Sequence, residues 1–124
     1  MLLTFRLDYV TRAVDVGTDR FEVSIVGYNF EILDTEEQEI LAYHWHPVSI
    51  SPVAHPHLHL THRARPFELS SGRRIALAEV HISTGFLTLA DIVRLLITEF
   101  DVEPRRSDWA AVLEADWPAH PANG

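Results

Sequence analysis

The pattern His-x-His occurs in the middle of the chain at residues 44–46 and again at residues 57–59. Side chains two residues apart point to the same side of an extended strand, so each copy places two imidazoles on one face. If the two strands are neighbours in a sheet, four imidazoles share one patch. His81, in a later alternating segment, could join them. The spacing therefore predicts a cluster of imidazole groups.

One chemistry that suits such a cluster is metal-independent cleavage of a phosphodiester, as in a ribonuclease. A neutral imidazole removes the proton of the 2′-hydroxyl and a protonated one donates to the leaving oxygen. Both forms coexist near neutral pH because imidazole has a pKa of ~6.5. We assign the acid–base pair to His57 and His59, an assisting role to His44, and the phosphate contact to Arg63, which lies just beyond. This mechanism needs no cofactor.

A metal site is the second chemistry that the same residues permit. Three imidazoles with an open coordination position form catalytic zinc sites, and neutral histidine also binds nickel, copper and iron. A cupin-type site is not indicated, because the nearest following acid, Glu68, lies too far along the chain. The candidate ligands for zinc or another transition metal are His44, His46, His57 and His59.

A third interpretation involves no catalysis. Histidine is often a half-buried polar residue in folded proteins, and the histidine face with the nearby arginines would then contact a partner or a second copy of the chain.

Residues 55–61 also resemble the motif of histidine-triad nucleotide hydrolases, although Pro56 departs from it. The residue types leave these interpretations open.

Charge and composition exclude several other classes. The chain has 124 residues and a formal net charge of −8, which argues against general nucleic-acid binding. It contains no cysteine and no lysine, which excludes disulfides, thiolate metal sites and Schiff-base chemistry. Such usage is typical of a cytoplasmic protein from a GC-rich bacterial genome. Residues 40–78 nevertheless carry a formal +3, from Glu68 and from Arg63, Arg65, Arg73 and Arg74.

Alternating apolar and polar residues predict an antiparallel sheet of five to seven strands. In the first strand, over residues 2–10, Leu3, Phe5, Leu7 and Tyr9 form the face that we expect to be buried. A turn or bulge is expected at residues 27–29. Further strands are expected at residues 20–26, 30–32, 38–46, 57–61, 67–69 and 73–83.

Two helices are expected after the sheet. Thr88 and Asp91 form a capping-box variant at the start of the first helix, and Ser107 is a suitable N-cap for a second helix over residues 107–115. The sequence thus predicts one α+β domain over residues 1–117, an antiparallel sheet with two C-terminal helices packed on it. Residues 118–124 are expected to form a flexible tail. No signal peptide or membrane-spanning segment is indicated.

The order of these features resembles the TumE-type toxin family of bacterial toxin–antitoxin systems. Members combine an N-terminal β-meander, a tyrosine before a His-Trp pair, a Pro-His-x-His cluster and a following helix. The chain departs from the family at residues 49–54, where an Asp-Asn-Ala-Pro stretch is missing, and in an insert at residues 64–83. The matching residues are Tyr43, His44, Trp45, Pro56, His57, His59, Leu89, Asp91, Ile92 and Val93.

This resemblance implies a toxin-like protein that acts on RNA and has a cognate antitoxin protein as its partner. A homodimer is the other assembly that we consider. The sequence hypothesis with the most specific chemistry is therefore a toxin-family protein with a metal-independent RNA-cleaving histidine site. A non-enzymatic interaction module and a histidine-rich metal-binding protein are the alternatives.

Overall fold

A computed structural model describes residues 1–15, 17, 19–50, 52–61 and 63–115. The chain forms two compact units, and the division into domains stays a prediction. The first unit consists of Met1–Tyr9 and Ile25–Gly85, and the second of Val10–Ser24 and the chain from Phe86 onward. The predicted tail at residues 118–124 lies outside the described residues. No helix in the described part is both long enough and apolar enough to cross a membrane.

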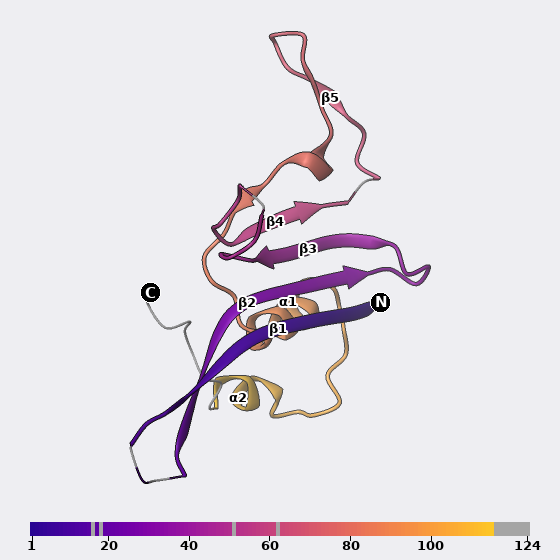
Figure 1. Ribbon diagram of the computed structural model, residues 1–124. Helices are drawn as coiled ribbons and strands as arrows, with labels where there is room; N and C mark the ends of the chain where they lie inside the picture. The colour runs from indigo at the N-terminus through magenta and orange to yellow at the C-terminus, as the bar shows by residue number, and fades with distance from the viewer. Residues whose placement is uncertain (16, 18, 51, 62, 116–124) are drawn as a thin grey trace. The chain divides into compact units, whose positions relative to one another are not determined.

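The predicted α+β class is confirmed, with a five-stranded sheet that precedes the helices (Figure 1). The strand order is β1-β2-β3-β4-β7, and the pairs β2–β3, β3–β4 and β4–β7 are antiparallel. Strands β5 and β6 form a separate two-stranded sheet. The strands are β1 (Leu2–Ala13), β2 (Phe21–Leu33), β3 (Glu39–Trp45), β4 (His57–Leu60), β5 (Phe67–Glu68), β6 (Arg74–Ile75) and β7 (Ile82–Ser83).

The core of the first unit lies on one face of β2 and β3. Tyr28, Phe30 and Ile32 alternate along β2, and each is at most 2% exposed. Their partners across the β2–β3 pair are Trp45, Tyr43 and Leu41 in turn. Because side chains alternate between the two faces of a strand, the residues between these apolar ones point to the opposite face of the sheet.

The turn or bulge predicted at residues 27–29 is wrong, because β2 runs through this segment without interruption. A Cβ atom at Gly27 would lie 3.1 Å from the Trp45 carbonyl oxygen and 3.3 Å from Asp8 Oδ2. The glycine therefore permits the close approach of neighbouring groups and does not reverse the chain. The shift in register occurs later, between Ile32 and Leu33.

The buried face predicted for the first strand is wrong at two of its four residues. Phe5 is 53% exposed and Tyr9 is 62% exposed, whereas Leu3 and Leu7 are partly buried. Alternation predicts the two faces of a strand, but it does not predict which residues of a face are covered by other parts of the chain. The aromatic residues of β1 are therefore available at the surface.

The segment at residues 67–83 is only partly extended. Phe67 and Glu68 pair with Ile75 and Arg74, and Gly72 in the predicted turn has φ 84°. The predicted long strand over residues 73–83 is wrong, since the 3₁₀ helix η1 (Leu77–Glu79) interrupts it. What remains of its second half is β7, which pairs with β4.

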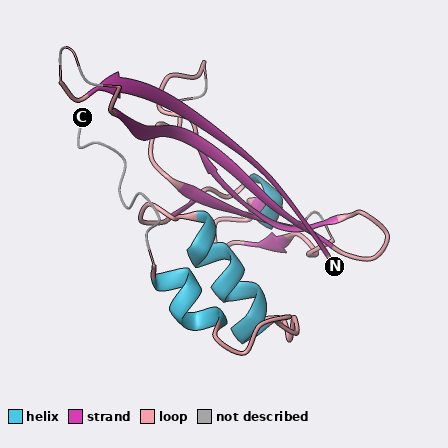
Figure 2. Cartoon of the chain, turned by 90° about the horizontal axis from the view of Figure 1, so that it is seen from below, coloured by secondary structure: helices cyan, strands magenta, loops and turns pink. Residues whose placement is uncertain are grey.

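Two helices follow the sheet, as predicted: α1 (Leu89–Glu99) and α2 (Trp109–Glu114) (Figure 2). The predicted capping box is present, because Thr88 Oγ1 accepts from the Asp91 backbone N–H and the Asp91 carboxylate accepts from the Thr88 backbone N–H. The predicted cap at Ser107 is wrong, since Asp108 is the N-cap residue of α2 and makes no side-chain capping bond.

We expect the β2–β3 core to dominate the stability of the first unit. Phe30 is 0% exposed, so Phe30→Ala should lower the free energy of unfolding by about 3–5 kcal/mol. The matched control is Phe67→Ala, because Phe67 is 45% exposed on β5 and its loss should cost less than about 1 kcal/mol. Urea denaturation measures both, and equal losses would contradict this assignment of the core.

Candidate functional site

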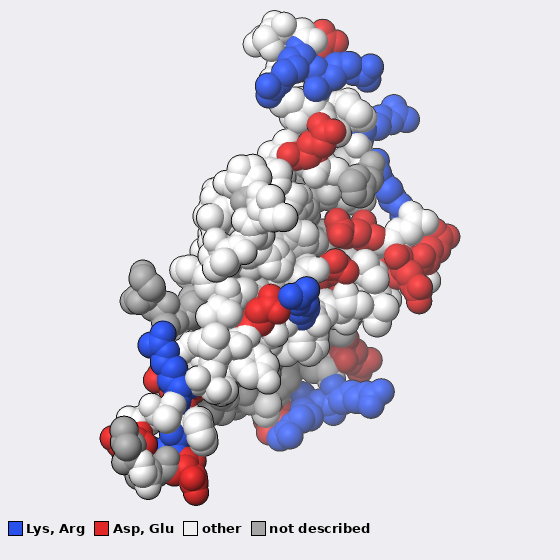
Figure 3. All heavy atoms as spheres, viewed as in Figure 1, with Lys and Arg blue, Asp and Glu red and all other residues white. Residues whose placement is uncertain are grey.

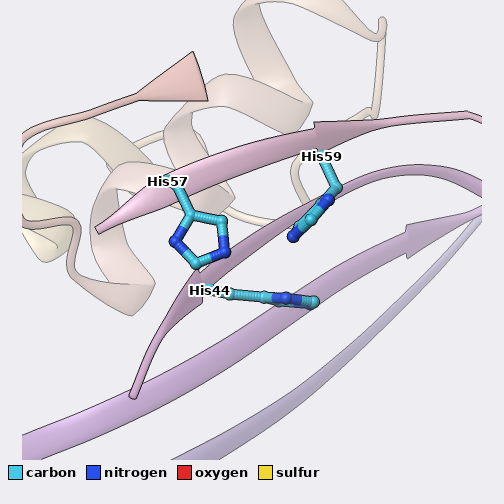
Figure 4. Close-up of side chains that lie close together, drawn as sticks. All are labelled: His44, His57 and His59. Atoms are coloured by element: carbon cyan, nitrogen blue, oxygen red, sulfur yellow. The ribbon is translucent and has the colours of Figure 1, made fainter. Parts of the chain in front are cut away.

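The predicted cluster of imidazoles is present on the face of the sheet opposite the core. In the β3–β4 pair, His44 lies directly across from His57, and His59 lies across from Ala42. The three histidines therefore project from two adjacent strands toward one another, as Figure 4 shows. The register alone produces this convergence, because residues 57 and 59 share a face and residue 44 lies opposite one of them.

The three rings are close enough to share a ligand. The ring centroid of His59 lies 4.8 Å from those of both His44 and His57, and the centroids of His44 and His57 are 5.7 Å apart. One ring nitrogen from each residue lies within 4.8 Å of the others. Nitrogens bound tetrahedrally to zinc at about 2.0–2.1 Å are about 3.3 Å apart, so small side-chain rotations would complete such a site.

Backbone carbonyls orient two of the three rings. The Nδ1 atom of His57 lies 2.8 Å from the His55 carbonyl oxygen, and that of His59 lies 3.4 Å from the Ala78 carbonyl oxygen. A carbonyl oxygen only accepts, so Nδ1–H must be the donor in both bonds. The lone pair of Nε2 is then free on each ring, which is the tautomer that a metal-binding histidine requires.

The third ring presents a buried nitrogen without a partner. Nε2 of His44 is inaccessible to solvent, and no hydrogen-bond partner for it occurs among the described residues. A buried polar atom left unsatisfied costs roughly 1–3 kcal/mol, so its retention suggests a function for this nitrogen. His44 itself belongs to the group of three histidines whose ligand atoms converge.

The surroundings hold the three imidazoles in the neutral state near pH 7. Burial, and then the neighbouring imidazoles of His59 and His57, lower the pKa of His44 to about 4. Burial is also the main cause that lowers the pKa of His57 and of His59, and the hydrogen bonds to carbonyls oppose it. Neutral imidazole is the form that coordinates metals, whereas a general acid must be protonated.

Three further histidines lie beside the triad of His44, His57 and His59, namely His46, His55 and His81. The ring of His81 lies 4.6 Å from that of His59 and 5.0 Å from that of His57, so His81 joins the cluster, as the alternation around it suggested. His46, the predicted fourth ligand, lies farther out, with its ring 6.0 Å from that of His44. The group of converging ligand atoms contains His44, His57 and His59 but not His46.

The structure does not bring the guanidinium of Arg63 to the imidazoles. Its Nη1 atom lies 2.9 Å from Asp34 and its Nε donates to Gln38 at 3.0 Å. Both partners belong to the turn between β2 and β3, which precedes β3, whereas His44 lies near the end of that strand. Arg63 therefore stabilises this turn in the structure, and its predicted phosphate contact has no support in the geometry.

The other arginines of the basic segment lie on or beside the small β5–β6 sheet. Arg74 belongs to β6, with Arg73 directly before it. In Figure 3, the basic side chains gather at the end of the first unit where Figure 1 labels β5. The local positive charge predicted from the sequence is therefore carried mainly by this hairpin.

Sequence reasoning missed two polar residues that complete the site face. Asn29 lies across from His44, and Glu31 lies across from Ala42. The Glu31 carboxylate accepts from Asn29 Nδ2 at 2.9 Å and from Thr4 Oγ1 at 3.1 Å. The signal was present in the alternation of Tyr28, Phe30 and Ile32, which assigns residues 29 and 31 to the opposite face.

Comparisons with known proteins identify no relative. No family model matches the chain, and neither a curated protein nor a solved structure matches it. The resemblance to the TumE-type toxin family therefore stays a prediction. Any functional conclusion must come from the geometry of the site.

The pKa shifts predict how the stability of the metal-free protein depends on pH. Below pH 6.5 the unfolded chain protonates its histidines, whereas His44 in the folded chain remains neutral until about pH 4. The free energy of unfolding should therefore fall as the pH decreases from 6.5 to 4. We expect a loss on the order of 1–2 kcal/mol for this partly exposed group.

Urea titrations at pH 6.5, 5.75 and 5.0 in EDTA test this expectation. His44→Gln removes the titrating group, so its stability should depend less on pH in this window than that of the wild-type protein. His55→Gln is the matched control outside the triad and should retain the wild-type slope. An unchanged slope in His44→Gln would contradict the assignment.

Proposed function

We propose that the chain is a metalloprotein in which His44, His57 and His59 bind one transition metal ion, zinc foremost, through their Nε2 atoms. The observation that carries this proposal is the convergence of three ligand nitrogens within 4.8 Å of one another. Two of the rings have their Nδ1–H groups bonded to carbonyls, which leaves Nε2 free to coordinate. The buried, unpartnered Nε2 of His44 supports the same assignment.

The donor set favours a catalytic zinc site over a structural one. Structural zinc sites are closed by four protein ligands and are usually rich in cysteine, which this chain lacks. Three imidazoles leave a tetrahedral position for water, and zinc lowers the pKa of bound water to about 7. The proposed reaction class is therefore hydrolysis of an ester or phosphoester by metal-activated water.

Glu31 provides a carboxylate on the same face of the sheet. Its charge acts on His44, where it opposes the lowering of the imidazole pKa. The hydrogen bonds from Asn29 and Thr4 fix the carboxylate in place. In this proposal the Glu31 carboxylate would serve as the positioning or proton-accepting group of the site.

Metal-independent RNA cleavage by a cytoplasmic toxin-family protein with a cognate antitoxin is the second candidate. The favouring observation is that the rings of His57, His59 and His81 lie 4.6–5.0 Å apart, close enough for two imidazoles to act on one substrate. The lowered pKa values of His57 and His59 suit a general base. They leave the acid role to a group outside this pair, which makes the metal site the better supported candidate.

Zinc titration of tag-free protein by isothermal calorimetry tests the metal proposal. One zinc ion should bind per chain, and His57→Ala should weaken binding by at least about 100-fold, because it removes a direct ligand. His55→Ala is the matched control, since it removes a nearby imidazole but keeps the carbonyl that orients His57. Absence of stoichiometric binding, or equal affinity in wild type and His57→Ala, would refute the metal site.

Hydrolysis assays distinguish the two candidates. We expect the zinc-loaded protein to cleave an activated phosphodiester, bis(p-nitrophenyl) phosphate, and to lose at least about 100-fold in rate when EDTA removes the ion. Glu31→Gln should bind zinc normally and show a slower rate. RNA cleavage that persists in EDTA and disappears in His57→Ala and His59→Ala would establish the second candidate instead.

A further inference from the structure

Strand β1 forms one edge of the five-stranded sheet and has a strand neighbour on only one side. An edge strand presents unpaired backbone N–H and C=O groups to any further strand. Natural proteins often protect such edges with proline, charged side chains, bulges or short length. Strand β1 spans Leu2–Ala13 and contains no proline, and its charged residues Arg6 and Asp8 form an ion pair with each other. Its part in the first unit, residues 2–9, is therefore a long edge that no other described strand pairs with beyond β2.

The sequence of this edge is complementary to itself. Consider two copies of β1 paired antiparallel so that Leu7 of one copy lies directly opposite Leu7 of the other, a register that we call centred on Leu7. In this register Arg6 of each copy faces Asp8 of the other. Phe5 of each copy likewise faces Tyr9 of the other. Opposite charges and aromatic pairs directly across strands are both stabilising. Each contact occurs twice because the arrangement has two-fold symmetry.

Neighbouring registers lack this complementarity. Centring the pair on Arg6 places two guanidinium groups opposite each other, and centring it on Asp8 places two carboxylates opposite each other. A shift by a single residue pairs the charged face of one copy with the apolar face of the other, because faces alternate along a strand. Of these registers, the one centred on Leu7 satisfies both faces.

Three of the side chains that this register uses are exposed, whereas Leu7 and Asp8 are partly buried. Phe5 and Tyr9 are 53% and 62% exposed, and the Arg6 side chain is 71% exposed. Arg6 Nε lies 2.9 Å from Asp8 Oδ1 within one chain, so the two charged groups already lie on the same side of β1. A second copy can extend this ion pair into a four-charge row while covering the aromatic residues on the other side.

We propose that two copies of this chain associate through antiparallel β1–β1 pairing centred on Leu7, which joins their sheets into one. This inference does not depend on the metal site. The surface accounts for the exposed aromatic residues of β1, which the first unit leaves uncovered. The partner that binds the β1 edge is then a second copy of the same chain.

Site-specific cross-linking tests the register, since the chain has no cysteine of its own. Leu7→Cys places the two thiols directly opposite, at a Cα separation that a disulfide can span. Thr4→Cys is the matched control, because its two thiols would lie about 20 Å apart. Oxidised glutathione, which is reduced as the disulfide forms, should cross-link Leu7→Cys at least tenfold faster. Equal rates would overturn the register.

Charge exchange tests the interface without altering Leu7. Sedimentation equilibrium should show a wild-type dimer, and Asp8→Arg should weaken it at least tenfold because it places four cations in one row. The double variant Arg6→Asp with Asp8→Arg restores opposite pairs and should restore the dimer. Glu103→Arg, a matched charge change in an exposed loop, should have no effect. A wild-type monomer at every concentration, or a dimer insensitive to Asp8→Arg, would overturn the proposal.

Discussion

The antiparallel pairing of β3 with β4 is the constraint on which the candidate site depends. Its register places His44 across from His57 and Ala42 across from His59. A slip by one residue would turn every side chain of one strand to the other face, and the imidazoles would then meet the apolar core. The core prevents this slip, because Tyr28, Phe30 and Ile32 of β2 fix the position of β3 through its buried face. Packing on one face thus determines the chemistry on the other.

The same arrangement explains why the histidines are neutral and oriented. Burying an imidazole disfavours its charged form, and neighbouring imidazoles add to this effect in His44. A buried ring nitrogen also needs a partner. His57 is only 5% exposed and meets this need through the carbonyl of His55, while His59 uses the carbonyl of Ala78. Each of these bonds leaves one ring nitrogen facing the cluster, and the small Ala42 side chain keeps bulk out of the space between the strands.

The two faces of the sheet and its β1 edge have different roles. One face holds the core, and the other holds the histidines together with Asn29 and Glu31. The edge at β1 carries exposed aromatic and charged residues that match a second copy of themselves. Arg63, which sequence reasoning placed at the site, instead joins the turn before β3 to the chain after β4. It therefore supports the strand pair that presents the imidazoles.

The sequence by itself determined the features that depend on local periodicity. Alternation predicted β3, β4 and the shared face of His57 and His59, and the Thr88–Asp91 spacing predicted the start of α1. It missed the path of β2 through Gly27, the exposure of Phe5 and the partners of Arg63. Only the tertiary structure decided these, because each depends on which group from a distant part of the chain lies alongside. Local spacing sets the direction of a side chain, whereas its neighbours depend on how separate strands pair.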